Sequence, residues 1–275
     1  MFALSMVWDP SKGLDLGFFT LHYYSVMWII AFLLGLQIMK RIYKHEGQSD
    51  DALDSLFIYA VVGIMLGARL GHVIFYQPEL ITEDFFSIFL PFKFKGGIEF
   101  TGFMGLASHG AAIAMIISMY LYNKKVLHKT VLWILDRVVI PVASGAVFVR
   151  IGNFINSEII GKPTGSDFGV IFKQLGEDFA RHPAQLYEAG SYIVVFFILW
   201  YVYWKTEKSE QPGFLFGLFL VLLWSVRFFV EFVKEAQNIE RADWLLNTGQ
   251  LLSIPLILVG LYFMFIYKPK TRANA

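Results

Sequence analysis

The chain has 275 residues, 56% of them hydrophobic, and a formal net charge of +1. A water-soluble domain cannot bury so large an apolar share, so the composition excludes an ordinary soluble fold and predicts a polytopic membrane protein. The balanced charge and the lack of a long basic run argue against a nucleic-acid partner. Because the sequence contains no cysteine, it excludes disulfides, thiolate metal sites and a cysteine nucleophile.

Long apolar segments predict an all-α fold with seven transmembrane helices in a single integral membrane domain, residues 1–275. A helix needs about 20 apolar residues to cross the hydrocarbon core. The first segment is too long for a cleavable signal and has no basic stretch before it, so we expect a retained span. The predicted spans are 18–39, 54–76, 102–122, 131–149, 186–204, 213–233 and 249–267.

The distribution of Lys and Arg predicts the orientation of these spans. One set of connections carries eleven of them in about 40 positions, and the other set carries nine in about 93 positions. The first set is expected to be cytoplasmic, which places the N-terminus outside and the C-terminus in the cytoplasm. The external region at about 150–185 is rich in glycine, which favours turns over regular elements.

A dense polar cluster follows the fourth apolar segment, which itself contains Asp136. Arg150, Asn153, Asn156 and Glu158 lie within nine residues of one another. If the helix continues past Arg150, residues three and four apart share a face. The cluster is either an interfacial helix end that meets water and lipid headgroups, or a site.

Other ionisable residues also lie in or beside apolar segments, where charge is costly and therefore a functional candidate. His109 stands among small residues in the third span, either as a proton acceptor or as a histidine bonded to a neighbouring helix. Arg227 and Glu231 are spaced i, i+4, which allows an intrahelical pair or a guanidinium fork oriented by a carboxylate. Arg69 allows either a snorkelling side chain or a binding role.

The fifth polar stretch, RHPAQLYEAG, begins at Arg181 and contains Gln185 and Glu188, which suit either a helix start or a binding role. In the predicted topology, four arginines lie towards the external half of the protein. Arginine binds phosphate through two parallel hydrogen bonds, and the phospholipid headgroup offers phosphate there. The sequence therefore predicts a lipid-phosphate site near the outer leaflet. These arginines are Arg69, Arg150, Arg181 and Arg227.

The segment VRIGNFINSEIIG, residues 149–161, resembles the signature of the bacterial prolipoprotein diacylglyceryl transferases. It matches at Arg150, Gly152, Asn153, Phe154, Asn156, Glu158 and Gly161, whereas Val149 replaces the first glycine. Further segments resemble the family in the family's order. They are LHYYSVMW with Tyr24, GARLGHVIFY, RHPAQLYE, VRFFVEF and TGQLLSIP.

The resemblance implies seven spans and an active site open to the outer face of the bacterial cytoplasmic membrane. It also implies transfer of the diacylglyceryl group of phosphatidylglycerol to the lipobox cysteine of a preprolipoprotein, with release of glycerol phosphate. Neither a metal nor another cofactor is expected. The implied partners are therefore phosphatidylglycerol, the preprolipoprotein signal peptide and membrane lipids, and no nucleic acid.

Residue roles follow from the same resemblance. Arg150 and Arg227 are expected to hold the lipid phosphate, while Glu158 and Glu231 orient their guanidiniums. His109 is expected to help deprotonate the incoming thiol, because the thiolate is the nucleophile. The remaining predicted substrate-binding residues are Tyr24, which would line the lipid path, and Arg69, Asn153, Asn156, Gly161, Arg181, Gln185 and Glu188.

Two positions depart from the family's pattern. The family's histidine, aligned without a gap, falls at Thr101, so we assign its role to His109 from the spacing to Arg150. A tyrosine that some members carry four residues before Arg227 is Leu223 here.

Two other classes of protein remain open from the residues alone. An ion-coupled transporter would also use intramembrane histidine, arginine and glutamate, although no pair of interrupted half-repeats is present. A scaffold or lipoprotein-binding receptor would not need an arginine–histidine set.

Overall fold

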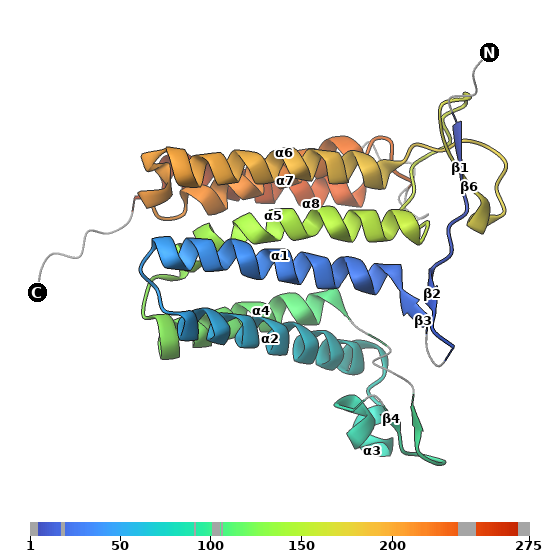
Figure 1. Cartoon of the computed structure of the whole chain (residues 1–275), viewed down its shortest axis with the longest axis horizontal. Helices are drawn as coiled ribbons and strands as arrows, with labels where there is room; N and C mark the ends of the chain where they lie inside the picture. The colour runs from blue at the N-terminus through green and yellow to red at the C-terminus, as the bar shows by residue number, and fades with distance from the viewer. Residues whose placement is uncertain are drawn as a thin grey trace, which may run out of the picture. The chain divides into compact units, whose positions relative to one another are not determined.

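The computed structural model describes residues 5–17, 20–90, 92–100, 105, 107–235 and 246–268, with only the backbone of Phe100, Ser108 and His109. Helices dominate the described residues (Figure 1). The chain divides into two compact units, residues 1–39 with 135–275 and residues 40–134. The main helices are α1 (Tyr23–His45), α2 (Asp50–Tyr76), α4 (Ser108–Tyr122), α5 (Val131–Ile155), α6 (Ala184–Lys205), α7 (Phe214–Val230) and α8 (Thr248–Leu261).

The prediction of a mostly helical polytopic membrane protein is confirmed. Among the described residues, five helices are long and apolar enough to cross a membrane, namely α1, α2, α5, α6 and α8 with its π-helical continuation to Ile266. The shorter apolar helix α7 has 17 residues. Helix α4 has 15 described residues and continues into a π-helical turn, Asn123–Leu127, while α3 (Leu80–Glu83) is a single turn.

The all-α description needs a correction, because three short two-stranded sheets are present among the described residues. In a loop expected to contain only turns, residues 169–172 form a strand, which pairs in parallel with a strand from the N-terminal segment. Backbone pairing across so large a sequence separation leaves no local signal. The pairs are β1 (Ser5–Trp8) with β6 (Gly169–Phe172), β2 (Gly13–Asp15) with β3 (Thr20–His22), and β4 (Phe92–Lys93) with β5 (Glu99–Phe100).

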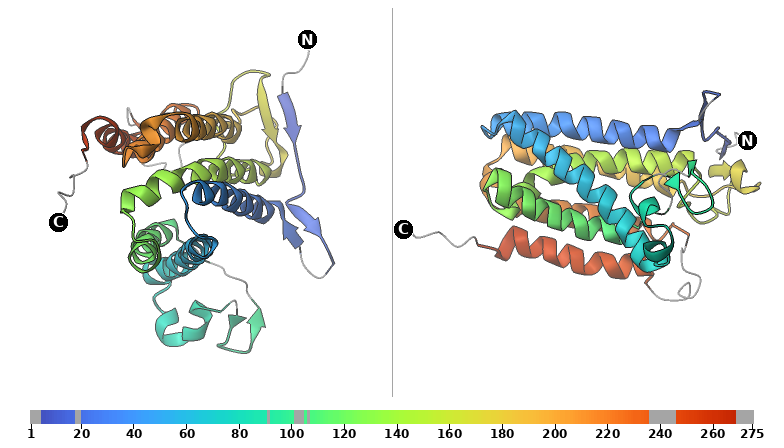
Figure 2. Two further views of the ribbon diagram at one scale, coloured as in Figure 1. Left: turned by 60° about the vertical axis from the view of Figure 1, so that its left-hand side comes forward. Right: turned by 90° about the horizontal axis from the view of Figure 1, so that it is seen from below.

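In the first unit, α5 lies between α1 on one side and the layer of α6, α7 and α8 on the other (Figures 1 and 2). The helix runs without interruption through Pro141. Asp136, which interrupts the apolar sequence, is fully buried and accepts hydrogen bonds from the backbone nitrogens of Gly213 and Phe216 at 2.7 and 2.9 Å. One helix thus caps the start of another, because the first backbone N–H groups of α7 need acceptors that lipid cannot supply.

The strand pair β1–β6 is anchored to the last turn of α5. Trp8 donates its indole N–H to the carbonyl of Phe154 at 3.0 Å, and the two rings are 4.4 Å apart. Phe154, Val170 and Phe172 form a buried cluster against Trp8 and Ile160. This small core holds the connection between α5 and α6 against the end of α5, where the polar cluster of the sequence is located.

In the second unit, α2 and α4 are packed through small residues. A Cβ added at Gly67 would meet the carbonyl oxygen of Gly110 at 2.5 Å, and one added at Gly71 would meet the Cα of Gly110 at 2.7 Å. Small residues spaced by four allow two helix backbones to approach this closely. The small residues around His109 therefore have a packing role.

We predict that Gly67→Ala lowers the free energy of unfolding by about 1–3 kcal/mol, the usual cost of overpacking. The added methyl group would strike the α4 backbone, which cannot give way as a flexible side chain can. Gly190→Ala is the matched control, since this helical glycine has open space around its Cα. Thermal unfolding of both variants in one detergent tests the prediction, and equal losses would contradict it.

Candidate functional site

The polar cluster of the sequence is located where α5 and α7 end and α6 and α8 begin. Helix α5 continues to Ile155, so Arg150 and Asn153 share a helix face, as expected for that spacing. Both residues are buried, and Arg150 Nη1 donates to Asn153 Oδ1 at 3.2 Å. Arg150 and Asn153 therefore lie on a helix and face each other in a buried position. This geometry favours a site over an interfacial helix end that meets water and lipid headgroups.

The carboxylate beside Arg150 belongs to Glu188 on α6. Arg150 Nε lies 2.7 Å from Glu188 Oε2, and the side chains are 11% and 1% exposed. We expected Glu158 to orient Arg150, but the carboxylate in direct contact with the guanidinium is that of Glu188. Glu188 lies one turn into α6. This helix packs beside α5 through a buried cluster that includes Tyr192 of α6 and Val147 of α5. The Tyr192 hydroxyl lies 3.5 Å from the second oxygen of Glu188.

Glu158 takes part in the site through two asparagines. Its Oε2 accepts from Asn153 Nδ2 and its Oε1 accepts from Asn156 Nδ2, each at 3.1 Å. Asn153 therefore connects Arg150 to Glu158, with its amide accepting from the guanidinium and donating to the carboxylate. Glu158 is exposed, in contrast to buried Glu188.

The backbone around Glu158 is strained. Ser157 and Ile159 both have φ of 56°, a left-handed conformation that is unfavourable for a β-branched residue. Gln185, fully buried at the start of α6, donates to the Glu158 carbonyl at 2.6 Å. Strained turns persist when surrounding contacts fix them, and they are concentrated at functional sites. The turn thus holds the Glu158 carboxylate next to both asparagines.

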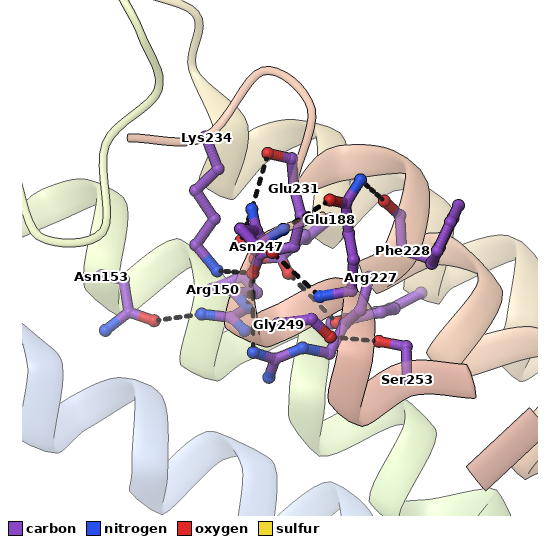
Figure 3. A network of polar contacts seen from close by, with 12 residues as sticks. Arg150, Asn153, Glu188, Arg227, Phe228, Glu231, Lys234, Asn247, Gly249 and Ser253 are labelled. Atoms are coloured by element: carbon purple, nitrogen blue, oxygen red, sulfur yellow. Dashed lines mark hydrogen bonds and ion pairs between the residues drawn. The ribbon is translucent and has the colours of Figure 1, made fainter. Parts of the chain in front are cut away.

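The second arginine has a different environment (Figure 3). Arg227 near the end of α7 lies 3.8 Å from Glu231, beyond hydrogen-bonding distance, and its guanidinium stands 5.3 Å from the Trp224 ring. The Glu231 carboxylate instead accepts from Lys234 Nζ at 2.9 Å and from Asn247 Nδ2 at 3.0 Å. The i, i+4 pair predicted from the sequence is present, but it is loose.

The segment TGQLLSIP contributes the start of α8 to this cluster. Asn247 caps the helix, with its side-chain oxygen accepting from the backbone nitrogen of Gln250 and the Gln250 side chain reciprocating. Gly249 packs directly on Glu231, since a Cβ there would meet the carboxyl carbon at 2.6 Å. A larger residue at this position would displace the carboxylate from its partners.

Tyr24 lies beside the same end of α5. A Cβ on Gly152 would meet the Tyr24 ring at 2.6 Å, so the glycine makes room for this tyrosine. In the sequence, Gly152 lies between Arg150 and Asn153. The structure thus brings the first-span tyrosine next to the polar cluster, as its assignment to the site requires.

Arg181 and Gly161 form a separate structural clamp. Arg181 donates twice to Glu177 and once to Glu235, each at 2.6 Å, and once to the carbonyl of Gly161 at 3.1 Å. The hydrogen bond to Glu177 raises the pKa of the Arg181 guanidinium above its ordinary value, so the cation is retained. A Cβ on Gly161 would strike His182 and Val233. These contacts stabilise the connection between α5 and α6, and the substrate-binding role of both residues stays a prediction.

Arg69 and His109 belong to the second unit. Arg69 donates to the backbone carbonyls of Ile88, Ser87 and Gly105 at 3.1, 2.9 and 3.4 Å, which ties α2 to the segment that follows it. His109 is in the first turn of α4, and its side chain lies outside the described part of the chain, as does Thr101. Within the first unit, Arg150 and Arg227 belong to one polar network, whereas Arg181 belongs to the separate clamp.

Sequence reasoning missed three contributors, Lys234, Asn247 and Tyr192. Lys234 lies beyond the end of α7, where it forms an isolated bridge with Gly161, so its contact with Glu231 does not follow from helical spacing. Asn247 precedes the TGQ segment as a helix cap, which is a recognisable signal. Tyr192 follows Glu188 by four residues, but it lies within an apolar helix, and no sequence pattern indicates that its hydroxyl approaches the site.

The arrangement suits an anionic ligand rather than a metal ion. No group of three or more metal-binding side chains occurs among the residues that the structure describes. Arg150 and Lys234 have close carboxylates in Glu188 and Glu231, whereas Arg227 lies 3.8 Å from Glu231 and keeps donors for an anion. Guanidinium groups with incomplete counter-ion contacts are the usual means of binding phosphate.

These observations define a polytopic membrane protein whose helix ends gather an arginine-centred polar site. Comparison with known proteins specifies the family. The sequence model described as prolipoprotein diacylglyceryl transferase matches residues 12–266, and the chain belongs to this family.

Relatives match along nearly the whole chain. A protein of Bacteroides fragilis is 38% identical over 270 residues, which cover 97% of each chain. A protein of Tolumonas auensis is 40% identical over 269 residues, which cover 97% of this chain and all of that one. Both relatives are named phosphatidylglycerol–prolipoprotein diacylglyceryl transferase.

We predict that Glu188→Ala lowers the free energy of unfolding by roughly 3–5 kcal/mol, because it leaves the buried Arg150 cation without its counter-ion. Glu83→Ala is the matched control. Its partner Lys95 lies 2.8 Å away, but the two side chains are 50% and 61% exposed, so the loss should stay below about 1 kcal/mol. Denaturant unfolding measures both, and a small loss for Glu188→Ala would contradict the prediction.

Proposed function

We propose that this protein transfers the diacylglyceryl group of phosphatidylglycerol to the lipobox cysteine thiol of preprolipoproteins. The thiolate sulfur attacks the glycerol carbon of the lipid, a carbon–sulfur bond forms, and the carbon–oxygen bond to phosphate breaks. Glycerol phosphate departs with the electron pair, and the thiol proton passes to a base. Two lines of support lead to this activity. Relatives that match nearly the whole chain are named for it, and the arginine site of this chain suits binding of a phosphate.

The observation that carries the proposal is the network containing Arg150 and Arg227 (Figure 3). The departing group develops charge on its phosphate, and fixed guanidiniums stabilise such charge without reorganisation. Arg150 is rigid because Glu188 and Asn153 hold it. Arg227 retains donors that are not engaged by Glu231 at hydrogen-bonding distance. Arg150 thus offers one phosphate a cation in a fixed position, and Arg227 offers it a cation whose donors are still available.

The remaining assignments belong to the same proposal. Tyr24 and Asn156 contact the substrates, and His109 receives the thiol proton. The Glu158 carboxylate acts through Asn153, which positions Arg150. The chain crosses the bacterial cytoplasmic membrane seven times as a single integral domain, with its N-terminus and active site on the periplasmic side and its C-terminus in the cytoplasm. The Lys and Arg distribution supports this orientation.

We predict that Arg150→Lys reduces diacylglyceryl transfer roughly 100-fold or more, as expected when an electrostatic stabiliser loses its donor geometry. A lysine keeps the charge but cannot contact Glu188, Asn153 and a phosphate through one planar fork. Purified protein is incubated with phosphatidylglycerol and a lipobox peptide, and the peptide mass is followed. Wild type should add one diacylglyceryl unit.

The control for this experiment is Arg41→Lys, an exposed arginine near the end of α1, which should retain normal transfer. Full activity of Arg150→Lys would show that the guanidinium fork is not required. Arg150→Ala also separates the enzyme from a scaffold, because a scaffold would still capture the peptide without changing its mass.

We predict that His109→Gln lowers the rate of diacylglyceryl transfer, because a glutamine side chain cannot accept the thiol proton as a base. The rate is measured with the peptide-mass assay at several pH values for wild type and variant. An unchanged rate and pH profile for the variant would exclude His109 as the proton acceptor.

A further inference from the structure

The two arginines of the site differ in how their charge is neutralised. Arg150 has a carboxylate of its own, since Glu188 lies 2.7 Å away and is 1% exposed. Arg227 has Glu231 four residues further along, yet the nearest approach is 3.8 Å. Helical spacing alone would permit closer contact, so something else holds the Glu231 carboxylate away from the guanidinium.

Lys234 and Asn247 occupy that carboxylate. Lys234 Nζ lies 2.9 Å from Glu231 Oε1, and Asn247 Nδ2 lies 3.0 Å from Oε2. Gly249 packs against the carboxyl group from α8 and leaves no room on that side. Both oxygens thus have short hydrogen bonds to donors other than Arg227.

The Lys234 ammonium is fixed in this position by its burial. Its side chain is 3% exposed, and a buried ammonium is tolerated only beside a carboxylate. Arg227, by contrast, is 29% exposed, and its buried Nε has no hydrogen-bond partner among the described residues. The partly exposed Arg227 and the buried Lys234 therefore share the Glu231 carboxylate, and Lys234 is the closer of the two.

We infer that Lys234 is a positioning residue that neutralises Glu231 and thereby keeps the Arg227 guanidinium available for the phosphate of the lipid substrate. This inference rests on the proposed function. Without the ammonium, Glu231 would retain a full negative charge with the Arg227 guanidinium 3.8 Å away. The guanidinium would then close on the carboxylate in a charge-assisted pair and compete with the phosphate.

The expected signature is kinetic rather than structural. A competing internal anion weakens binding of the lipid and leaves the subsequent chemistry largely intact, which raises KM more than it lowers kcat. Lys234→Met keeps the length of the side chain and removes its charge. We expect KM for phosphatidylglycerol to rise about tenfold or more, the scale on which an altered charge pair changes affinity.

Three further variants make the test specific. Lys234→Arg restores a cation and should return KM towards the wild-type value. The double variant Lys234→Met with Glu231→Gln should recover affinity relative to Lys234→Met, because a neutral amide does not compete for the guanidinium. Lys162→Met is the matched control, since the side chain of this exposed lysine donates to a backbone carbonyl, that of Phe232, at 3.0 Å.

Initial rates are measured in mixed micelles at a fixed lipobox peptide concentration and a varied mole fraction of phosphatidylglycerol. Thermal unfolding is measured in parallel, so that a lower fraction of folded enzyme, which lowers kcat alone, is distinguished from a change in KM. A normal KM for Lys234→Met, or a double variant that binds lipid no better than Lys234→Met, would overturn the inference. A wild-type enzyme that leaves the peptide mass unchanged would instead overturn the proposed function.

Discussion

Neutralisation of buried charge is the constraint on which the rest of this structure depends. Arg150 and Glu188 are almost completely removed from solvent and lie 2.7 Å apart, so neither could occupy its position alone. The ion pair joins the end of α5 to the beginning of α6. The Asn153 amide accepts a hydrogen bond from the Arg150 guanidinium and donates one to the Glu158 carboxylate on the following turn. A site with fixed geometry results, because each group is required by its neighbour.

Local backbone features preserve this arrangement. Gly152 admits the Tyr24 ring and Gly249 admits the Glu231 carboxylate, so side chains from other segments reach the polar cluster directly. Gln185 holds the strained turn at Glu158, and the strand pair β1–β6 covers the end of α5 through Trp8. The glycines and the strained turn, which weaken regular structure, are therefore located at the site itself, where close approach and unusual backbone angles are needed.

The sequence predicted those parts of the site that depend on helical spacing. Arg150 and Asn153 share a face because they are three residues apart, and Arg227 and Glu231 pair because they are four apart. The ion pair of Arg150 with Glu188 crosses 38 positions in the chain and depends on the packing of α5 against α6, which periodicity does not reveal. The membrane-spanning class followed from composition, whereas the strand pairing of residues 5–8 with 169–172 depends on tertiary contact alone.

Arg181 and Arg227 differ in how completely their donors are used. Arg181 contacts Glu177 and Glu235 at 2.6 Å, so a third anion would meet two carboxylates already in place. Among the described residues, Arg227 shares the Glu231 carboxylate with Lys234 and remains partly exposed. In the proposed reaction, an incoming phosphate would therefore complete the coordination of Arg227, whereas it would have to displace that of Arg181. Residue type predicted both as phosphate ligands, and only the count of carboxylates around each guanidinium distinguishes them.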